Sequence, residues 1–233
     1  MSNLLEAYGW TPVPRSQSKL LGSIDSKPAA KISTSDVTLP SSQLAQKVFE
    51  YAKAQLPEQT FNHSMRVFYY GSALIKQHLP HFAPSTETYY LTCLLHDIGT
   101  TTTNLHATRM SFEFHGGLLA LELLKSYGAP QEQAESVAEA IIRHQDLGES
   151  GMITTVGQLI QLTTVFDNMG INPSLIHKDT IDSVTKAYPR NKWSSCFAAT
   201  IREEVGLKPW CHTTAIDGFA EGVEGNKLME PWE

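Results

Sequence analysis

The segment YYLTCLLHDIG, residues 89–99, decides the fold, because a largely apolar run ends there in a histidine and an aspartate. Ser85 can start a helix ahead of this segment, and Gly99 supplies a stop just beyond the pair. Burying two ionisable side chains directly after the most apolar helix is costly unless something compensates their desolvation, and a bound metal ion does so. Because a helix end lets adjacent side chains turn toward one point, we predict that His96 and Asp97 bind a metal ion together.

Two further stripes at helical spacing carry the remaining candidate ligands. Residues 60–79 repeat apolar side chains at this spacing, and His63 lies on the same stripe, so we expect it to point inward. A later stripe is formed by Ile160, Thr163, Thr164 and Asp167. The candidate ligand set is His63, His96, Asp97 and Asp167. Mixed imidazole and carboxylate ligands suit a borderline or harder divalent ion, such as zinc, iron, manganese or nickel, rather than a thiolate site.

The rest of the chain also has helical patterns. Beyond the segments above, helices are predicted over residues 41–57, 111–127, 130–144, 179–188 and 191–205, with a further helix from about residue 154 that includes residue 167. No convincing run of alternating strand residues occurs, and the threonines after Gly99 are expected to form a loop. The predicted fold is therefore all-α, a single helical bundle spanning residues 41–233. Residues 1–40 lack sustained periodicity and are expected to form an extended N-terminal arm or leader.

Composition excludes several classes of protein. The formal net charge of -6 comes without a dense lysine or arginine cluster, so nucleic acid is not an expected partner. No stretch approaches the roughly 20 apolar residues of a membrane span, and the N-terminus has no secretory signal pattern. The three cysteines are widely spaced and odd in number, which favours a reducing, cytoplasmic location.

The order and spacing of the four candidate ligands resemble those of HD-domain metal-dependent hydrolases. Longer strings resemble more closely the fungal cyanamide hydratase family. These strings are NHSMRVF (62–68), TCLLHD (92–97), RMSF (109–112), AEAIIRH (138–144) and KPWCHTT (208–214). The resemblance implies an HD-domain helical fold, one bound metal ion usually taken to be zinc, and a homo-oligomer. The implied reaction is that of a hydro-lyase, the hydration of the small molecule cyanamide to urea.

Three residues are candidates for catalytic roles beside the metal ion. His144 lies on an inward stripe and has an ordinary pKa near neutrality, so we expect it to act as acid and base, or alternatively to orient Asp97 or Asp167. Asp167 can bind the metal ion and also take a proton from water. Asn168 can hydrogen-bond the amino end of the substrate, although a capping amide is an equal alternative.

Other conspicuous residues have structural interpretations that compete with functional ones. His115 precedes two glycines and is expected to pack near the site, with metal or substrate contact left open. Arg66, three residues after His63, can pair with an acidic ligand. Trp210 and His212 can close the pocket over a small substrate or anchor the C-terminal tail.

Three rival functions remain open. An HD-type phosphohydrolase of nucleotides or phosphate esters needs cationic groups for phosphoryl charge, and residues 98–103 after the histidine-aspartate pair contain none. A two-metal centre, as in a diiron oxygenase or a phosphodiesterase-type site, would add His115 and His144 to the four ligands. A non-catalytic helical scaffold would keep a metal ion for structure alone, but mixed ligands of this kind commonly leave a position open for water.

Overall fold

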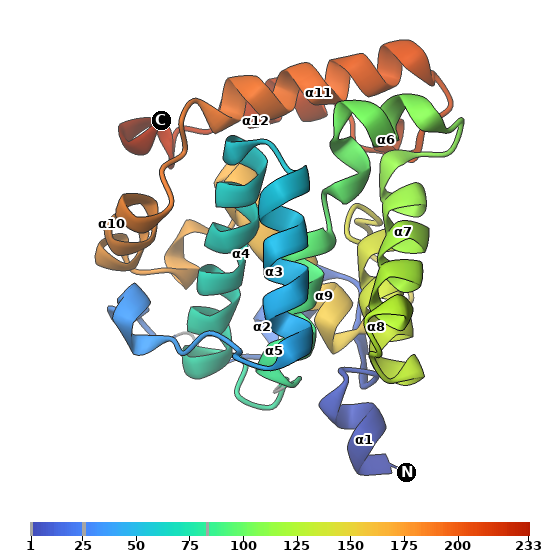
Figure 1. Cartoon of the computed structure of the whole chain (residues 1–233). Coiled ribbons are helices and arrows are strands. Elements are labelled where there is room, and N and C mark those ends of the chain that lie inside the picture. The colour runs from blue at the N-terminus through green and yellow to red at the C-terminus, as the bar shows by residue number, and fades with distance from the viewer. Residues whose placement is uncertain (1, 25–26, 83) are drawn as a thin grey trace.

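A computed structural model describes residues 2–24, 27–82 and 84–233, and it confirms the all-α fold (Figure 1). The helices are α1 (Ser2–Ala7), α2 (Gln17–Gly22), α3 (Gln43–Gln55), α4 (Glu58–Gln77), α5 (Thr86–Leu95), α6 (Thr102–Ala107), α7 (Phe112–Ser126), α8 (Gln131–Ile142), α9 (Thr155–Met169), α10 (Lys178–Ala187), α11 (Trp193–Leu207) and α12 (Phe219–Glu224). Short 3-10 helices are η1 (Thr34–Asp36), η2 (Ile98–Thr100), η3 (Pro173–Leu175), η4 (His212–Ala215) and η5 (Glu230–Trp232). Two strands, β1 (Pro12–Pro14) and β2 (Met152–Thr154), pair antiparallel.

Helix α4 is the central helix of the bundle. Its residues 60–74 are all buried, because α5, α9 and α11 pack around it. Figure 1 shows α3, α4, α7 and α8 standing side by side, with α11 lying across one end of them. His63 on α4 is therefore buried, as its spacing predicted.

The close approach of α5 to α4 depends on a glycine. A Cβ atom at Gly71 would lie 2.1 Å from the Tyr89 hydroxyl, so only glycine leaves room for that ring. The hydroxyl donates to the carbonyl oxygen of Val67 at 3.0 Å. This contact fixes α5 against α4 and brings the end of α5 toward His63.

The predicted helix starts are confirmed where polar side chains cap them. Ser42, Ser85 and Thr154 each accept a hydrogen bond from the backbone three residues ahead. The stop is different: α5 ends at Leu95, and the chain turns into η2 immediately afterwards. A Cβ atom at Gly99 would lie 2.1 Å from the carbonyl oxygen of Phe112, so this glycine permits close packing of η2 on α7.

The loop predicted after Gly99 is wrong, because this segment contains α6. Thr101 caps α6 by accepting a hydrogen bond from the backbone nitrogen of Asn104 at 3.3 Å. The threonines that suggested a loop therefore start a helix.

The first 40 residues contain more regular structure than their pattern indicated. They include α1, β1, α2 and η1, and β1 pairs with the strand that leads into α9. The backbone nitrogen of Ser85 also donates to the carbonyl oxygen of Ala7 at 2.6 Å. The division into an arm and a catalytic domain stays a prediction. In the part of the chain that the structure describes, no helix has both the length and the apolar character needed to cross a bilayer.

Candidate metal centre and active site

His63, His96 and Asp97 form a buried group of potential metal ligands. His63 comes from α4, and the other two follow directly after the last residue of α5. One ligand atom from each residue lies within 4.8 Å of the others. The two Nε2 atoms are 3.2 Å apart, and Oδ2 of Asp97 lies 3.2 Å from Nε2 of His96 and 3.7 Å from Nε2 of His63. The structure therefore brings together three of the four predicted ligands.

The hydrogen bonds on the opposite ring nitrogens fix how these imidazoles are protonated. Nδ1 of His96 lies 2.8 Å from the carbonyl oxygen of Cys93, which can only accept, so Nδ1 carries the hydrogen. Nδ1 of His63 lies 2.6 Å from Oδ2 of Asp167, an ionised carboxylate, and must also donate. In neutral rings, both Nε2 atoms are left with a lone pair facing Asp97.

This arrangement leaves several buried acceptors without donors. Two Nε2 lone pairs only 3.2 Å apart cannot hydrogen-bond to each other, and neither carboxylate oxygen of Asp97 has a hydrogen-bond partner. Unpaired buried acceptors are expensive unless a cation or proton lies among them. Since the donor set is two imidazoles and one carboxylate, the group fits a divalent metal ion such as zinc or iron.

The three groups shift each other's pKa in different directions. Burial lowers the pKa of His63 to about 4, against the opposing hydrogen bond to Asp167. Burial also acts to lower the pKa of His96, but the Asp97 carboxylate outweighs it and leaves that pKa raised. Burial acts to raise the pKa of Asp97, yet the neighbouring His96 and His63 hold it well below its usual range. Asp97 is therefore ionised at neutral pH.

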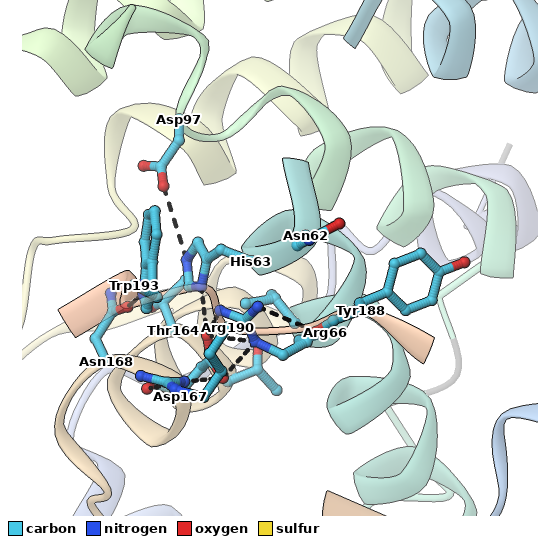
Figure 2. A network of polar contacts seen from close by, with 12 residues as sticks. Asn62, His63, Arg66, Asp97, Thr164, Asp167, Asn168, Tyr188, Arg190 and Trp193 are labelled. Atoms are coloured by element: carbon cyan, nitrogen blue, oxygen red, sulfur yellow. Dashed lines mark hydrogen bonds and ion pairs between the residues drawn. The ribbon is translucent and has the colours of Figure 1, made fainter. Parts of the chain in front are cut away.

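Asp167, the fourth predicted ligand, lies outside this group (Figure 2). Its carboxylate contacts the far nitrogen of His63 and is held by two buried guanidinium groups. Arg66 donates from Nη2 to Oδ2 at 2.8 Å, and Arg190 donates from Nη1 to Oδ1 at 2.8 Å. Burial alone would raise the pKa of Asp167, but the two arginines lower it far below its usual range. The predicted pairing of Arg66 with an acidic residue is observed.

A cavity of about 10 Å3, room for roughly one water molecule, adjoins the ligand group. Its lining residues are His96, Asp97, His144, Gln145, Leu147, Thr164, Val165, Asn168, Ile216 and Phe219. His144 follows the end of α8, and its Nε2 lies 3.9 Å from Oδ1 of Asp97. Because Nδ1 donates to the carbonyl oxygen of Ile141 at 2.7 Å, Nε2 of neutral His144 carries a lone pair. Burial and the nearby His96 lower the pKa of this ring.

Helix α9 contributes Thr164 and Asn168 to the cavity, one helical turn apart. The side-chain oxygen of Asn168 accepts a hydrogen bond from Nε1 of Trp193 at 2.8 Å, so its NH2 group is the end left to donate. Thr164 donates to the carbonyl oxygen of Ile160 at 2.8 Å, which leaves its hydroxyl lone pairs as acceptors. The sequence pattern placed Thr164 on an inward helical stripe but did not predict that it lies beside Asn168 in the cavity lining.

Three other candidates lie away from the cavity lining. His115 is partly exposed and belongs to neither the ligand group nor the lining. Trp210 is 62% exposed and donates to the carbonyl oxygen of Arg109, so it is not a core anchor. His212 pairs through Nδ1 with Oε1 of buried Glu113 at 2.8 Å.

Arg190, which sequence reasoning missed, follows α10 in a connection with no periodic pattern.

Comparisons with known proteins agree with this site. The HD domain family model matches residues 60–169, a span that contains the ligand group, His144 and Asp167. The helical fold and this match define an HD-domain protein, and its buried histidine-aspartate group is a candidate metal site. Two curated proteins of Saccharomyces cerevisiae, cyanamide hydratase DDI2 and cyanamide hydratase DDI3, are each 42% identical over 222 residues. The match covers 94% of this chain and 96% of each relative. The chain belongs to the fungal cyanamide hydratase family.

Proposed function

We propose that this protein is a cyanamide hydratase, which adds water to the nitrile carbon of cyanamide to give urea. The observation that carries the proposal is the buried His63, His96 and Asp97 group, whose unpaired acceptor atoms lie beside a cavity with room for about one water molecule. The relatives that are similar over nearly the whole chain carry the same activity in their names. These three residues would hold the metal ion, with zinc as the proposed occupant.

The bound ion would supply one piece of chemistry, lowering the pKa of a water molecule from about 16 toward 7. His144 would do the rest of the proton handling, and the proposal is supported by its place in the cavity lining and by the hydrogen bond from Nδ1 to the carbonyl oxygen of Ile141, which leaves Nε2 with a lone pair. It accepts a proton from the attacking water as the new oxygen-carbon bond forms. It then returns the proton to the nitrile nitrogen, where negative charge builds as the triple bond becomes a double bond. Tautomerisation of the isourea product gives urea.

Asn168 and Asp167 have different proposed roles. The NH2 group of Asn168 would donate to the nitrile nitrogen, while its oxygen, which accepts from Trp193, keeps a second lone pair for the amino end of the substrate. Asp167 is a positioning residue: it accepts the hydrogen of Nδ1 of His63 and so keeps Nε2 free to bind the ion. Its role as a fourth ligand, predicted from sequence, remains untested.

The cavity favours a hydratase over a phosphohydrolase. Of the described residues, no lysine or arginine lines it, and the nearby Arg66 and Arg190 are both committed to Asp167. A phosphoryl group would find no cationic side chain to stabilise its charge there. Cyanamide is neutral and has three heavy atoms, so it needs no such group.

We also propose a cytoplasmic location and a homo-oligomeric state. The free thiols of Cys93, Cys196 and Cys211 support the first, since cytosolic thiols stay reduced. The second is what the family resemblance implies.

The direct test is to incubate purified, metal-analysed protein with cyanamide and to measure urea. We expect urea to form, and to disappear in His96→Asn, which removes one ligand from the group. His81→Asn, at an exposed site, is the matched control and should keep full activity. Urea formation by His96→Asn at the wild-type rate, or none by the wild type, would overturn the proposal.

A further inference from the structure

A single apolar wall separates the metal-site cavity from a much larger surface groove. The groove measures about 470 Å3 and is lined mainly by residues of α11 and by the segment 213–221. Among the described lining residues, two belong to both cavities, Ile216 and Phe219. These two side chains therefore form part of the boundary between the groove and the cavity beside the ligand group.

The wall is held in place on the side of η4. The Thr213 hydroxyl lies 2.6 Å from Oε2 of Glu204 and 3.2 Å from the side-chain amide oxygen of Gln145, a cavity residue. The other oxygen of Glu204 accepts from the backbone nitrogen of Phe112 at 2.7 Å. These buried polar contacts tie the segment that carries Ile216 to the start of α7 and to the cavity.

The wall is also continuous with the metal ligands through aromatic packing. Gly218, with φ +62°, turns the chain into α12 and places Phe219 against Phe197, with centroids 5.8 Å apart. Phe197 stacks on Trp193 at 4.9 Å, and Trp193 stacks on the His63 ring at 4.4 Å. Phe219 therefore cannot move without disturbing this stack, whereas Ile216 is half-buried at its edge.

We propose that Ile216 and Phe219 form the size-selecting wall of the active site and the passage by which substrate reaches it from the groove. This inference rests on the function proposed above and identifies the residues that restrict the size of the substrate. Both side chains are apolar, so the wall offers a neutral small molecule no bond to form and discriminates by size alone. N-alkylated cyanamides share the N≡C–N unit but need more room, and a hydrophobic pocket rejects each surplus methyl by roughly 10-fold to 200-fold.

The experiment measures kcat/KM for cyanamide and for dimethylcyanamide in three metal-loaded proteins. In Ile216→Ala, we expect the dimethylcyanamide to cyanamide ratio to rise about 10-fold or more over the wild type. Val205→Ala is the matched control, since Val205 is also half-buried and lines only the outer groove. Its ratio should equal that of the wild type.

A substitution that enlarges the side chain at position 216 should have the opposite effect and narrow the passage. Ile216→Trp should lower kcat/KM for cyanamide at least about 10-fold while metal content and helical circular dichroism stay at wild-type values. An unchanged ratio in Ile216→Ala, or an equal rise in Val205→Ala, would overturn the wall while urea formation by the wild type still stands. Wild-type protein that forms no urea would overturn the function and the wall together.

Discussion

The two buried aspartates of the site, Asp97 and Asp167, have the same side chain and almost the same burial but opposite surroundings. Asp167 receives hydrogen bonds from two arginines and one histidine, so its charge is fully compensated by protein. Asp97 has no hydrogen-bond partner on either oxygen and faces two imidazole lone pairs. A buried carboxylate without donors fits a cation ligand, whereas one that accepts several hydrogen bonds fits a positioning residue.

The largest expected effect comes from removing the uncompensated carboxylate. Asp97→Asn should lose the bound metal ion and at least about 1000-fold of urea-forming activity, because activated water lowers the barrier by several kcal/mol. Metal analysis and a urea assay measure both losses, with the exposed Asp217→Asn as control. An Asp97→Asn protein that keeps its metal ion would remove the distinction between the two aspartates.

His144, the neighbour of Asp97 at the cavity, gives the next largest effect. His144→Ala should retain close to one metal ion per chain yet lose roughly 100-fold to 10,000-fold in turnover, the usual range for general acid and base catalysis. Metal content and kcat are measured on the same sample. If the variant comes out metal-free, His144 belongs among the ligands, and a two-metal centre becomes a serious alternative.

Replacing Asp167 should lower the free energy of unfolding, whereas replacing Asp97 should remove the metal ion. Asp167→Asn leaves buried Arg66 without an anion and Arg190 with Glu233 alone, which should lower the free energy of unfolding by about 3 kcal/mol. Urea denaturation of the metal-free proteins measures this loss. The control is Asp179→Asn, an exposed partner of Lys31, which should cost less than about 1 kcal/mol. Equal losses in the two variants would contradict the assigned role.

Glu113 is an intermediate case, a buried carboxylate with His212 as its partner on one oxygen. The hydrogen bond to Glu113, which outweighs burial, raises the pKa of His212 above its ordinary value. The pair therefore contributes stability that is fully present below pH 6.5 and is lost as pH rises through the folded pKa. His212→Gln should be destabilised relative to the wild type at pH 6, by up to about 1 kcal/mol, and by less at pH 9. An equal difference at both pH values would show that the pairing carries no charge.

The metal group could be predicted from sequence because its signals are local. An apolar run ending in His96 and Asp97, and a helical stripe containing His63, need no knowledge of distant partners. The stripe through Asp167 was less informative, because residues 155–168 of α9 are all buried and no single direction is inward. Thr164 and Asn168 lie toward the cavity, while Asp167 lies toward two arginines. Arg190 reaches Asp167 from a non-periodic connection, which no spacing rule could have indicated.

The most direct test of the central claim is a crystal structure of the metal-loaded wild-type protein, with the ion located by its anomalous signal. We predict one ion within about 2.0–2.3 Å of Nε2 of His63, Nε2 of His96 and a carboxylate oxygen of Asp97. Asp167 should remain hydrogen-bonded to Nδ1 of His63. An oxygen of Asp167 within bonding distance of the ion would contradict the account.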